Sequence, residues 1–471
     1  MKNFLITVIL ILSSLTGRGG EVHLSGYAPG AAGSHLEIYH QPDPVTGQYF
    51  LISRIEIPAK GEFEAGVACD DLCWLRLRYG VSEFSMLVRE GQSYELRLPP
   101  YKEMTRIDRL NPFFEYRVSH IRLEGADDLN NTIKYIDSLY YDYTGRITRS
   151  IYLGKVFQNK DSLLRSFVQL RTMLYDDYSV KYHNYRHCLL KMVAEKQVRP
   201  AEDDIELINR EFIPAMPAYA ELVNQVFNAY IRRLASSGGE DSLRVYINAG
   251  NKYRHITDIL GRQGLLENTS LMDFILLSNL YKEYHSGGFR KEGIESIFEW
   301  ISENAADEYN RQLAAIITDK INRLKPGTIP PAFRLMNNRG NIFTLDSLRG
   351  KLSILGFGTA ELPGTRTELE LIKSWAGDYR DEIRLVMIML DEDFKASMDR
   401  VANNNEHAFI FLDGSASDRL LTDYDIRYLP VFYLLDRETK LIRSPAPLPS
   451  ENLRSLVIKE LKDSLMDDIR D

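Results

Sequence analysis

The chain has 471 residues, of which 44% are hydrophobic, so it can bury several cores; at roughly 150 residues per domain we expect about three domains. Its 58 lysines and arginines are outnumbered by 66 aspartates and glutamates. The resulting net charge of −8 argues against a nucleic-acid partner, which would need a basic face. The chain has only three cysteines, which excludes a fold built on a disulfide framework.

The N-terminus has the layout of a secretory signal peptide. Lys2 is followed by an apolar run through Leu15 and then by small residues. The run is short for a membrane span, and no other stretch approaches 18 uninterrupted apolar residues, so we expect no span in the mature protein. We therefore predict a signal peptide over residues 1–20, and a mature protein that is periplasmic or otherwise exported.

Residues 21–105 are predicted to form an antiparallel β-sandwich. Short runs typical of strands alternate with turns that contain Pro and Gly, such as Ala28-Pro29-Gly30. The expected strands are Val22–Leu24, His35–Tyr39, Phe50–Ile57, Gly61–Glu64, Trp74–Tyr79, Phe84–Val88 and Ser93–Leu98.

Two of the three cysteines lie in this strand-rich region. Phe63–Ala68 and Trp74–Tyr79 alternate like strands, and Asp70-Asp71 between them suits a tight hairpin turn that would bring Cys69 and Cys73 together. A disulfide between them and two simply buried thiols both stay open. We expect no catalytic role in either case, because the segment lacks the short C-x-x-C spacing and the helix N-terminus of a redox motif.

In residues 125–325 the apolar residues recur at helical spacing, which predicts a helical middle domain. Ile133, Ile136 and Tyr140 share one face of a helix that begins at Asp127 or Asp128, and Ser270 with Asp273 is placed like a capping box. Further expected helices include Asp203–Phe212, Tyr219–Leu234, Ser270–Tyr284 and Lys291–Leu324. Pro326-Gly327 and Pro330-Pro331 then break the helical pattern and mark the join to a last domain.

Residues 326–471 alternate buried strands with helices. Lys351–Phe357 reads as a buried strand and Thr365–Tyr379 as a helix packed on one face, so the turn between them leads to a helix N-terminus. The other expected elements are the strands Ile383–Leu390, Phe409–Leu412, Val431–Leu435 and Leu441-Ile442, and the helices Phe394–Asn403 and Glu451–Leu465. This order is the one that a thioredoxin fold requires.

The segment FGTAELPGTRTEL (Phe357–Leu369) resembles the F-W-A-x-W-C-x-x-C-R-x-E-x pattern of periplasmic thiol-disulfide oxidoreductases of the TlpA-like branch. Arg366 and Glu368 stand in matching places, and Leu429-Pro430 resembles the family's cis-proline. The resemblance covers about the last third of the chain and implies an α/β thioredoxin-like fold there. The layout of residues 21–105 resembles the N-terminal β domains that precede such domains in exported Bacteroidetes proteins.

When Phe357–Leu369 is aligned with this pattern, Leu362 and Thr365 stand in the places of the family's two cysteines. Thiol–disulfide exchange runs through a thiolate, which a helix N-terminus stabilises, and neither an aliphatic side chain nor a hydroxyl can take its place. A peroxiredoxin function fails for the same reason. We therefore expect no catalytic residues and no cofactor in a multidomain α+β protein.

The groove of the resembling family remains a candidate binding surface. It would be formed by Glu361, Pro363 and Gly364 on one side and by Leu429 and Pro430 on the other, because a cis-proline strand presents unpaired backbone groups to an extended peptide. Glu361 stands where the family has a large apolar ring. A degenerate groove without a ligand is the alternative.

His183 and His187 are four residues apart on an expected helix, with Cys188 beside them, and could share one face toward a zinc ion. The same segment carries several tyrosines and reads more simply as an aromatic packing stripe, so we predict no metal site.

Three functions follow from these readings. We favour an exported protein without redox chemistry that binds or scaffolds an unknown protein or peptide of the cell envelope. The alternatives are a thiol-disulfide oxidoreductase of the TlpA-like type, with a sulfur from Cys188 or from a partner, and a glycan- or peptide-binding envelope protein.

Overall fold

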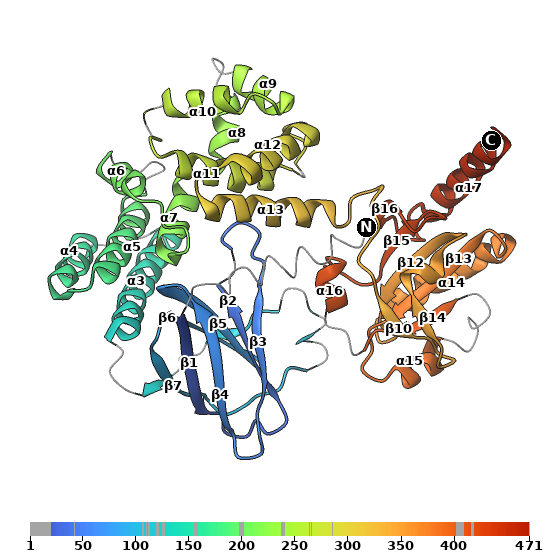
Figure 1. The fold of residues 1–471 in the computed structure, drawn as a ribbon, viewed down its shortest axis with the longest axis horizontal. Helices are drawn as coiled ribbons and strands as arrows, with labels where there is room; N and C mark the ends of the chain where they lie inside the picture. Colours follow the sequence, from blue (N-terminus) through green and yellow to red (C-terminus); the bar gives the residue numbers. More distant parts are fainter. Residues whose placement is uncertain are drawn as a thin grey trace. The chain divides into compact units, whose positions relative to one another are not determined.

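The structure is a computed structural model that describes residues 20–470 with short gaps (Figure 1). The gaps are residues 42, 106–107, 110, 112–113, 119–121, 125–127, 155–158, 197–201, 237–240, 263, 265, 285, 402–408 and 416–418. Residues 1–19, which hold almost all of the predicted signal peptide, lie outside the described residues. Among the described residues no helix is both long enough and apolar enough to cross a membrane.

The chain forms two compact units. The first comprises Met1–Glu103 and Tyr116–Thr318, and the second comprises Met104–Glu115 and Asp319–Asp471. The strand-rich region and most of the helical region therefore belong to one unit. The protein is multidomain and contains both helices and sheets, as expected.

The strand-rich part of the first unit consists of two sheets with a common core (Figure 1). One sheet has the order β4-β1-β7-β9 and the other the order β3-β2-β5-β6-β8. The strands are β1 (Gly20–Tyr27), β2 (His35–His40), β3 (Leu51–Glu56), β4 (Glu62–Cys69), β5 (Leu72–Tyr79), β6 (Ser82–Arg89), β7 (Ser93–Arg97), β8 (Arg117–Val118) and β9 (Arg122–Glu124). Apolar residues alternate inward, as Phe63, Val67 and Cys69 do on β4.

Two expectations for this region are wrong. The hairpin at Asp70-Asp71 does not form, because β4 pairs with β1 while β5 pairs with β2 and β6, so the chain crosses there from one sheet to the other. The sheets are also not wholly antiparallel: β1 pairs with β7, and β6 with β8, in parallel. Strands β5 and β6 belong to the second sheet. The chain then returns to the first sheet at β7, which runs parallel to β1.

The helical part of the first unit follows β9. Its elements are α3 (Asp128–Tyr152), α4 (Lys160–Leu170), η2 (Arg171–Met173), α5 (Asp177–Glu195), α6 (Glu202–Arg210), α7 (Pro217–Val226), α8 (Tyr230–Ser236), α9 (Asp241–Ala249), α10 (Tyr253–Arg262), α11 (Thr269–Glu283) and α12 (Lys291–Asn304), and α13 (Glu308–Asn322) leads into the second unit. It is tied to the sheets by hydrogen bonds: the Trp74 indole donates to the Tyr178 hydroxyl at 2.6 Å, and the Asn130 side chain bonds both backbone groups of Leu87.

Several helix boundaries differ from the expected ones. Lys291–Leu324 is interrupted between α12 and α13, and Tyr219–Leu234 is interrupted between α7 and α8, where Ala229 has a φ of 52°. The predicted capping box at α11 is wrong as well. Asn268 caps this helix by accepting a hydrogen bond from the Leu271 amide, whereas Asp273 is buried and accepts one from the Tyr253 hydroxyl.

The second unit is built on a five-stranded sheet of order β14-β13-β12-β15-β16. Strands β12, β13 and β14 are parallel, β15 pairs antiparallel with β12, and β16 pairs antiparallel with β15. The elements after the hairpin β10 (Arg334–Met336) and β11 (Ile342–Thr344) are η3 (Leu345–Leu348), β12 (Leu352–Gly358), α14 (Pro363–Ala376), η4 (Gly377–Tyr379), β13 (Ile383–Met389), α15 (Phe394–Val401), β14 (Ile410–Asp413), α16 (Arg419–Asp423), β15 (Val431–Leu435), β16 (Leu441–Ala446) and α17 (Leu453–Arg470).

Both faces of this sheet are covered. Apolar residues of α14, α15 and α17 pack on one face, among them Leu369, Val401 and Val457, while η3 and α16 contribute to the core on the other face. Strand β12 is buried along its whole length, which explains its uninterrupted apolar sequence. The order β12-α14-β13-α15-β14-β15-β16-α17, with the short α16 added, is that of a thioredoxin-type fold, as the sequence pattern predicts.

Candidate functional site

The candidate site lies where β12 ends and α14 begins. Gly358 closes β12, and a Cβ atom on it would lie 2.5 Å from Cε of Met387 and 2.7 Å from Cγ2 of Thr365. A larger residue at position 358 would therefore require the side chains of Met387 and Thr365 to shift. The first turn of α14 therefore packs directly on the end of the strand.

A buried carboxylate holds the turn between these two elements. Oδ1 of Asp391, which follows β13, accepts a hydrogen bond from the Thr359 hydroxyl at 2.6 Å, and its two oxygens lie 3.0 Å from the Ala360 amide. Asp393 caps α15 by accepting from the Ala396 amide at 2.9 Å. Asp391 and Asp393 thus have structural partners within the unit.

Leu362 and Thr365, the two positions predicted from the sequence to match the family's cysteines, differ in exposure. Leu362 is the N-cap residue of α14 and is 41% exposed, whereas Thr365, in the first turn, is fully buried. The Thr365 amide donates to the Leu362 carbonyl at 3.1 Å, but its side-chain hydroxyl has no hydrogen-bond partner among the described residues. Because leucine offers no side-chain acceptor, the N-cap hydrogen bond of α14 is missing too.

A cis peptide bond between Leu429 and Pro430 faces this helix turn. A Cβ atom on Gly364 would lie 3.9 Å from Cδ of Pro430, so the two backbones are in close reach. Tyr428 is 53% exposed, and within the described part of the chain the backbone groups of Tyr428 and Leu429 make no hydrogen bond. The structure thus brings Gly364, in the first turn of α14, close to Pro430, which directly precedes β15; Leu362 and Pro363 adjoin Gly364 in the chain, and Leu429 adjoins Pro430.

The charged residues around the turn have different roles. The side chain of Glu361 is exposed and forms no ion pair with other described residues. Glu368 is buried and accepts from both the amide and the hydroxyl of Ser450, at 2.9 and 2.6 Å, so it fastens α14 to the residues before α17. Glu361 is therefore an exposed negative charge next to the turn.

The cysteines all lie in the first unit. Cys69, at the end of β4, and Cys73, in β5, form a disulfide with a Cα–Cα distance of 5.9 Å that joins the two sheets at the crossing. Cys188 on α5 is buried, and its thiol donates to Oδ1 of Asp204 at 3.2 Å. Burial, together with the negative charge of Asp204, raises the pKa of the Cys188 thiol well above its ordinary value, which leaves little thiolate at neutral pH.

The histidine pair on α5 packs as an aromatic stripe. Nε2 of His183 lies 2.7 Å from the Phe167 carbonyl oxygen, its ring stacks on the Phe167 ring at 4.9 Å, and the His187 ring follows at 6.5 Å. Burial lowers the pKa of both imidazoles, so both are neutral at pH 7. Across the part of the chain that the structure describes, no group of three His, Cys, Asp or Glu side chains could hold a metal ion.

Sequence reasoning missed the hydrogen bonds that Asp391 makes to Thr359 and Ala360. A polar residue directly after the buried strand β13 is the signal that could have found them, because it lies at the same sheet edge as the end of β12. It also missed Tyr428, an aromatic residue directly before Leu429-Pro430.

Comparisons with known proteins return structural neighbours alone. No protein-family model and no curated protein sequence matches the chain. A thioredoxin domain of a thiol-disulfide oxidoreductase from Bacteroides vulgatus is similar at 20% identity, over 29% of this chain and 97% of that one, with a TM-score of 0.27. A protein from Chlorobium tepidum named as the thiol:disulfide interchange protein DsbE is similar at 20% identity, over 30% of this chain and 97% of that one, with a TM-score of 0.26. Yeast Sco1 is similar at 19% identity, over 29% of this chain and 98% of that one, with a TM-score of 0.25. Likenesses of this size carry no inference about activity.

Proposed function

We propose that the chain is an exported protein of the cell envelope whose C-terminal unit has a thioredoxin-like fold without redox chemistry and serves in binding or scaffolding. The observation that carries this proposal is the first turn of α14 beside cis-Pro430. It holds Leu362 in the exposed position and Thr365 in the buried one, where a redox pair would need two sulfurs. A leucine and a buried threonine cannot form or break a disulfide.

The same turn supports binding of an extended peptide. Leu362 and Tyr428 present exposed apolar surface, and the backbone of Tyr428 and Leu429 has unused donors and acceptors that an added strand could pair with. The carboxylate of Glu361 favours a ligand with a basic side chain near the turn. The proposed ligand is therefore a peptide segment in extended conformation, of mixed apolar and basic character.

The redox half of the proposal is tested by thiol-dependent reduction of insulin disulfides. We expect residues 21–471 to show no turnover above buffer, with the C69S/C73S/C188S variant as a matched control. Turnover that the three substitutions abolish would establish the oxidoreductase alternative. Turnover that survives them would contradict the account of the chemistry.

The binding half is tested by affinity capture from the cell envelope with two matched variants. L362D/Y428D places charges on the proposed groove, and L371D places one on an exposed leucine of α14 outside the groove. We expect captured partners to be lost with L362D/Y428D and retained with L371D. If the native chain, L362D/Y428D and L371D capture the same partners equally, the groove is not the binding surface.

A further inference from the structure

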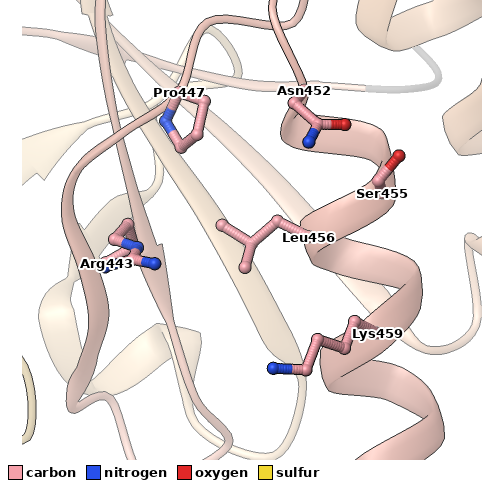
Figure 2. A pocket seen from close by; sticks show the side chains of 6 residues that line it. All are labelled: Arg443, Pro447, Asn452, Ser455, Leu456 and Lys459. Carbon is pink, nitrogen blue, oxygen red and sulfur yellow. The ribbon is translucent and has the colours of Figure 1, made fainter.

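A second feature of the C-terminal unit is a hollow of about 320 Å³ between the edge strand β16 and helix α17. Figure 2 shows Arg443 reaching it from the strand and Lys459 from the helix, with Leu456 between them. Pro447, Asn452 and Ser455 complete the lining. It shares no residue with the turn at α14, so it goes beyond the function proposed above.

The polar side chains of this hollow are unused within the described residues. Arg443 and Lys459 form no ion pair there, and the side chains of Asn452 and Ser455 form no hydrogen bond. No acidic residue lines the hollow. Two positive charges therefore face one opening without a counter-charge from the protein, and an anion placed between them would relieve their repulsion.

The apolar part of the lining narrows the class of anion. Leu456 packs against the core and, with Pro447, supplies an apolar surface beside the cations. A ligand that complements this lining carries a small anionic group, such as a carboxylate, next to an aliphatic group. The net charge of −8 on the whole chain opposes a polyanion such as a nucleic acid, which leaves a ligand with a single local charge.

We propose that the hollow between β16 and α17 binds the C-terminal carboxylate of a polypeptide whose last side chain is aliphatic. In an extended peptide, adjacent side chains point to opposite faces, and side chains two residues apart share a face but are separated by about 7 Å, so an internal acidic residue and an aliphatic one fit a hollow of about 320 Å³ less closely. A C-terminal residue carries its carboxylate and its side chain on one Cα. The carboxylate lies between Arg443 and Lys459, and the side chain lies on Leu456 and Pro447.

The test is fluorescence polarisation of the full mature chain with three labelled hexapeptides. One ends in Ala-Leu with a free carboxylate, the second is the same peptide amidated at its C-terminus, and the third is amidated and carries an internal Asp before the final Leu. Loss of a charged hydrogen bond corresponds to about a tenfold change in Kd. We expect the free acid to bind at least about tenfold more tightly than either amidated peptide.

Variants assign the binding to the hollow. R443Q and K459Q should each weaken binding of the free acid about tenfold. R454Q removes one positive charge from an exposed position of α17 outside the hollow and should leave Kd unchanged, and L362D tests the turn at α14 in the same assay. Equal binding of free acid and amide, no binding of the free acid, or insensitivity to both R443Q and K459Q would overturn the proposal. If L362D loses binding while R443Q and K459Q keep it, the peptide binds at the turn before α14 and not in the hollow, which would also overturn the proposal.

Discussion

The second unit has a helix N-terminus beside a cis-proline but no cysteine, whereas the cysteine pair of the first unit lies between two strands and not at a helix N-terminus. At α14 the backbone geometry is in place and the side chains are Leu362 and Thr365. At the crossing from β4 to β5 the disulfide of Cys69 and Cys73 lies between two strands. Thiol chemistry needs both a sulfur and a group that stabilises its thiolate, and in this chain the two requirements are met in different places.

The strongest test of this comparison adds the missing sulfurs to the second unit. The variant L362C/T365C, made in a C69S/C73S background, should form a disulfide and reduce insulin, because the N-terminus of α14 lowers the pKa of the introduced exposed thiol below the ordinary value of about 8.5. The background protein should show no activity. L362C alone lacks the second thiol and should stall as a mixed disulfide. A folded double variant that forms the disulfide and does not turn over would show that the helix turn lacks the chemistry assigned to it.

A second experiment uses pH to change the stability of the first unit without changing that of the second. Burial raises the pKa of Asp273 in α11, from an ordinary value of 3.8 to about 6. The unfolded chain then releases this proton at a lower pH than the folded chain, so stability is lost as pH rises from about 4 to about 6. The loss is about 3 kcal/mol in the free energy of unfolding.

The measurement is chemical denaturation of the native chain and of D273N between pH 4 and pH 7.5. The amide of the variant still accepts from the Tyr253 hydroxyl but does not ionise. We expect the difference in unfolding free energy between the two proteins to grow in favour of D273N with rising pH, in the transition of the first unit alone. A difference independent of pH would contradict the raised pKa.

Removing the disulfide tests the other side of the comparison. C69S/C73S should lower the free energy of unfolding of the first unit by roughly 2 kcal/mol, because the bond closes a loop of only a few residues. The insulin assay should be unaffected. Thiol labelling of protein isolated from its native cells, with and without prior reduction, shows whether the bond is present in the cell, and two freely labelled thiols would contradict the pairing.

The smallest expected effect concerns Thr365. Its hydroxyl is buried without a partner, so T365V should raise the free energy of unfolding of the second unit by about 1 kcal/mol. T365S keeps the hydroxyl and loses the methyl group that packs near Gly358, and it should lower stability by a similar amount. If T365V is instead destabilising, the hydroxyl has a partner and the site is more polar than described.

The order of elements in the second unit could be predicted because its strands are continuous apolar runs, such as Leu352–Gly358, bounded by clear turns. The hairpin at Asp70-Asp71 was predicted wrongly for a physical reason. Alternation of apolar residues in β4 and β5 shows which side of each strand faces the core, but both sheets of a sandwich face the same core. The pattern therefore does not tell which sheet a strand joins.

Parts of the candidate site depend on contacts between distant positions. Leu362, Thr365 and Pro430 could be placed from their motif, but the hydrogen bond from Thr359 to Asp391 joins residues 32 positions apart. The hollow at Arg443 and Lys459 likewise has no local signature, because its strand and helix are ordinary ones. Ser270 was expected to cap α11 from spacing alone, and the side chain of Asn268 takes that place.

The hydrogen bonds of Asp391 have a consequence for how this unit can change over evolution. The shape of the turn before α14 is set by a carboxylate that follows a neighbouring strand, and not by the residues at positions 362 and 365. Substitutions at those two positions therefore leave the framework standing. A reactive centre can disappear from such a scaffold without unfolding it, and the surface that remains is free to acquire a different partner.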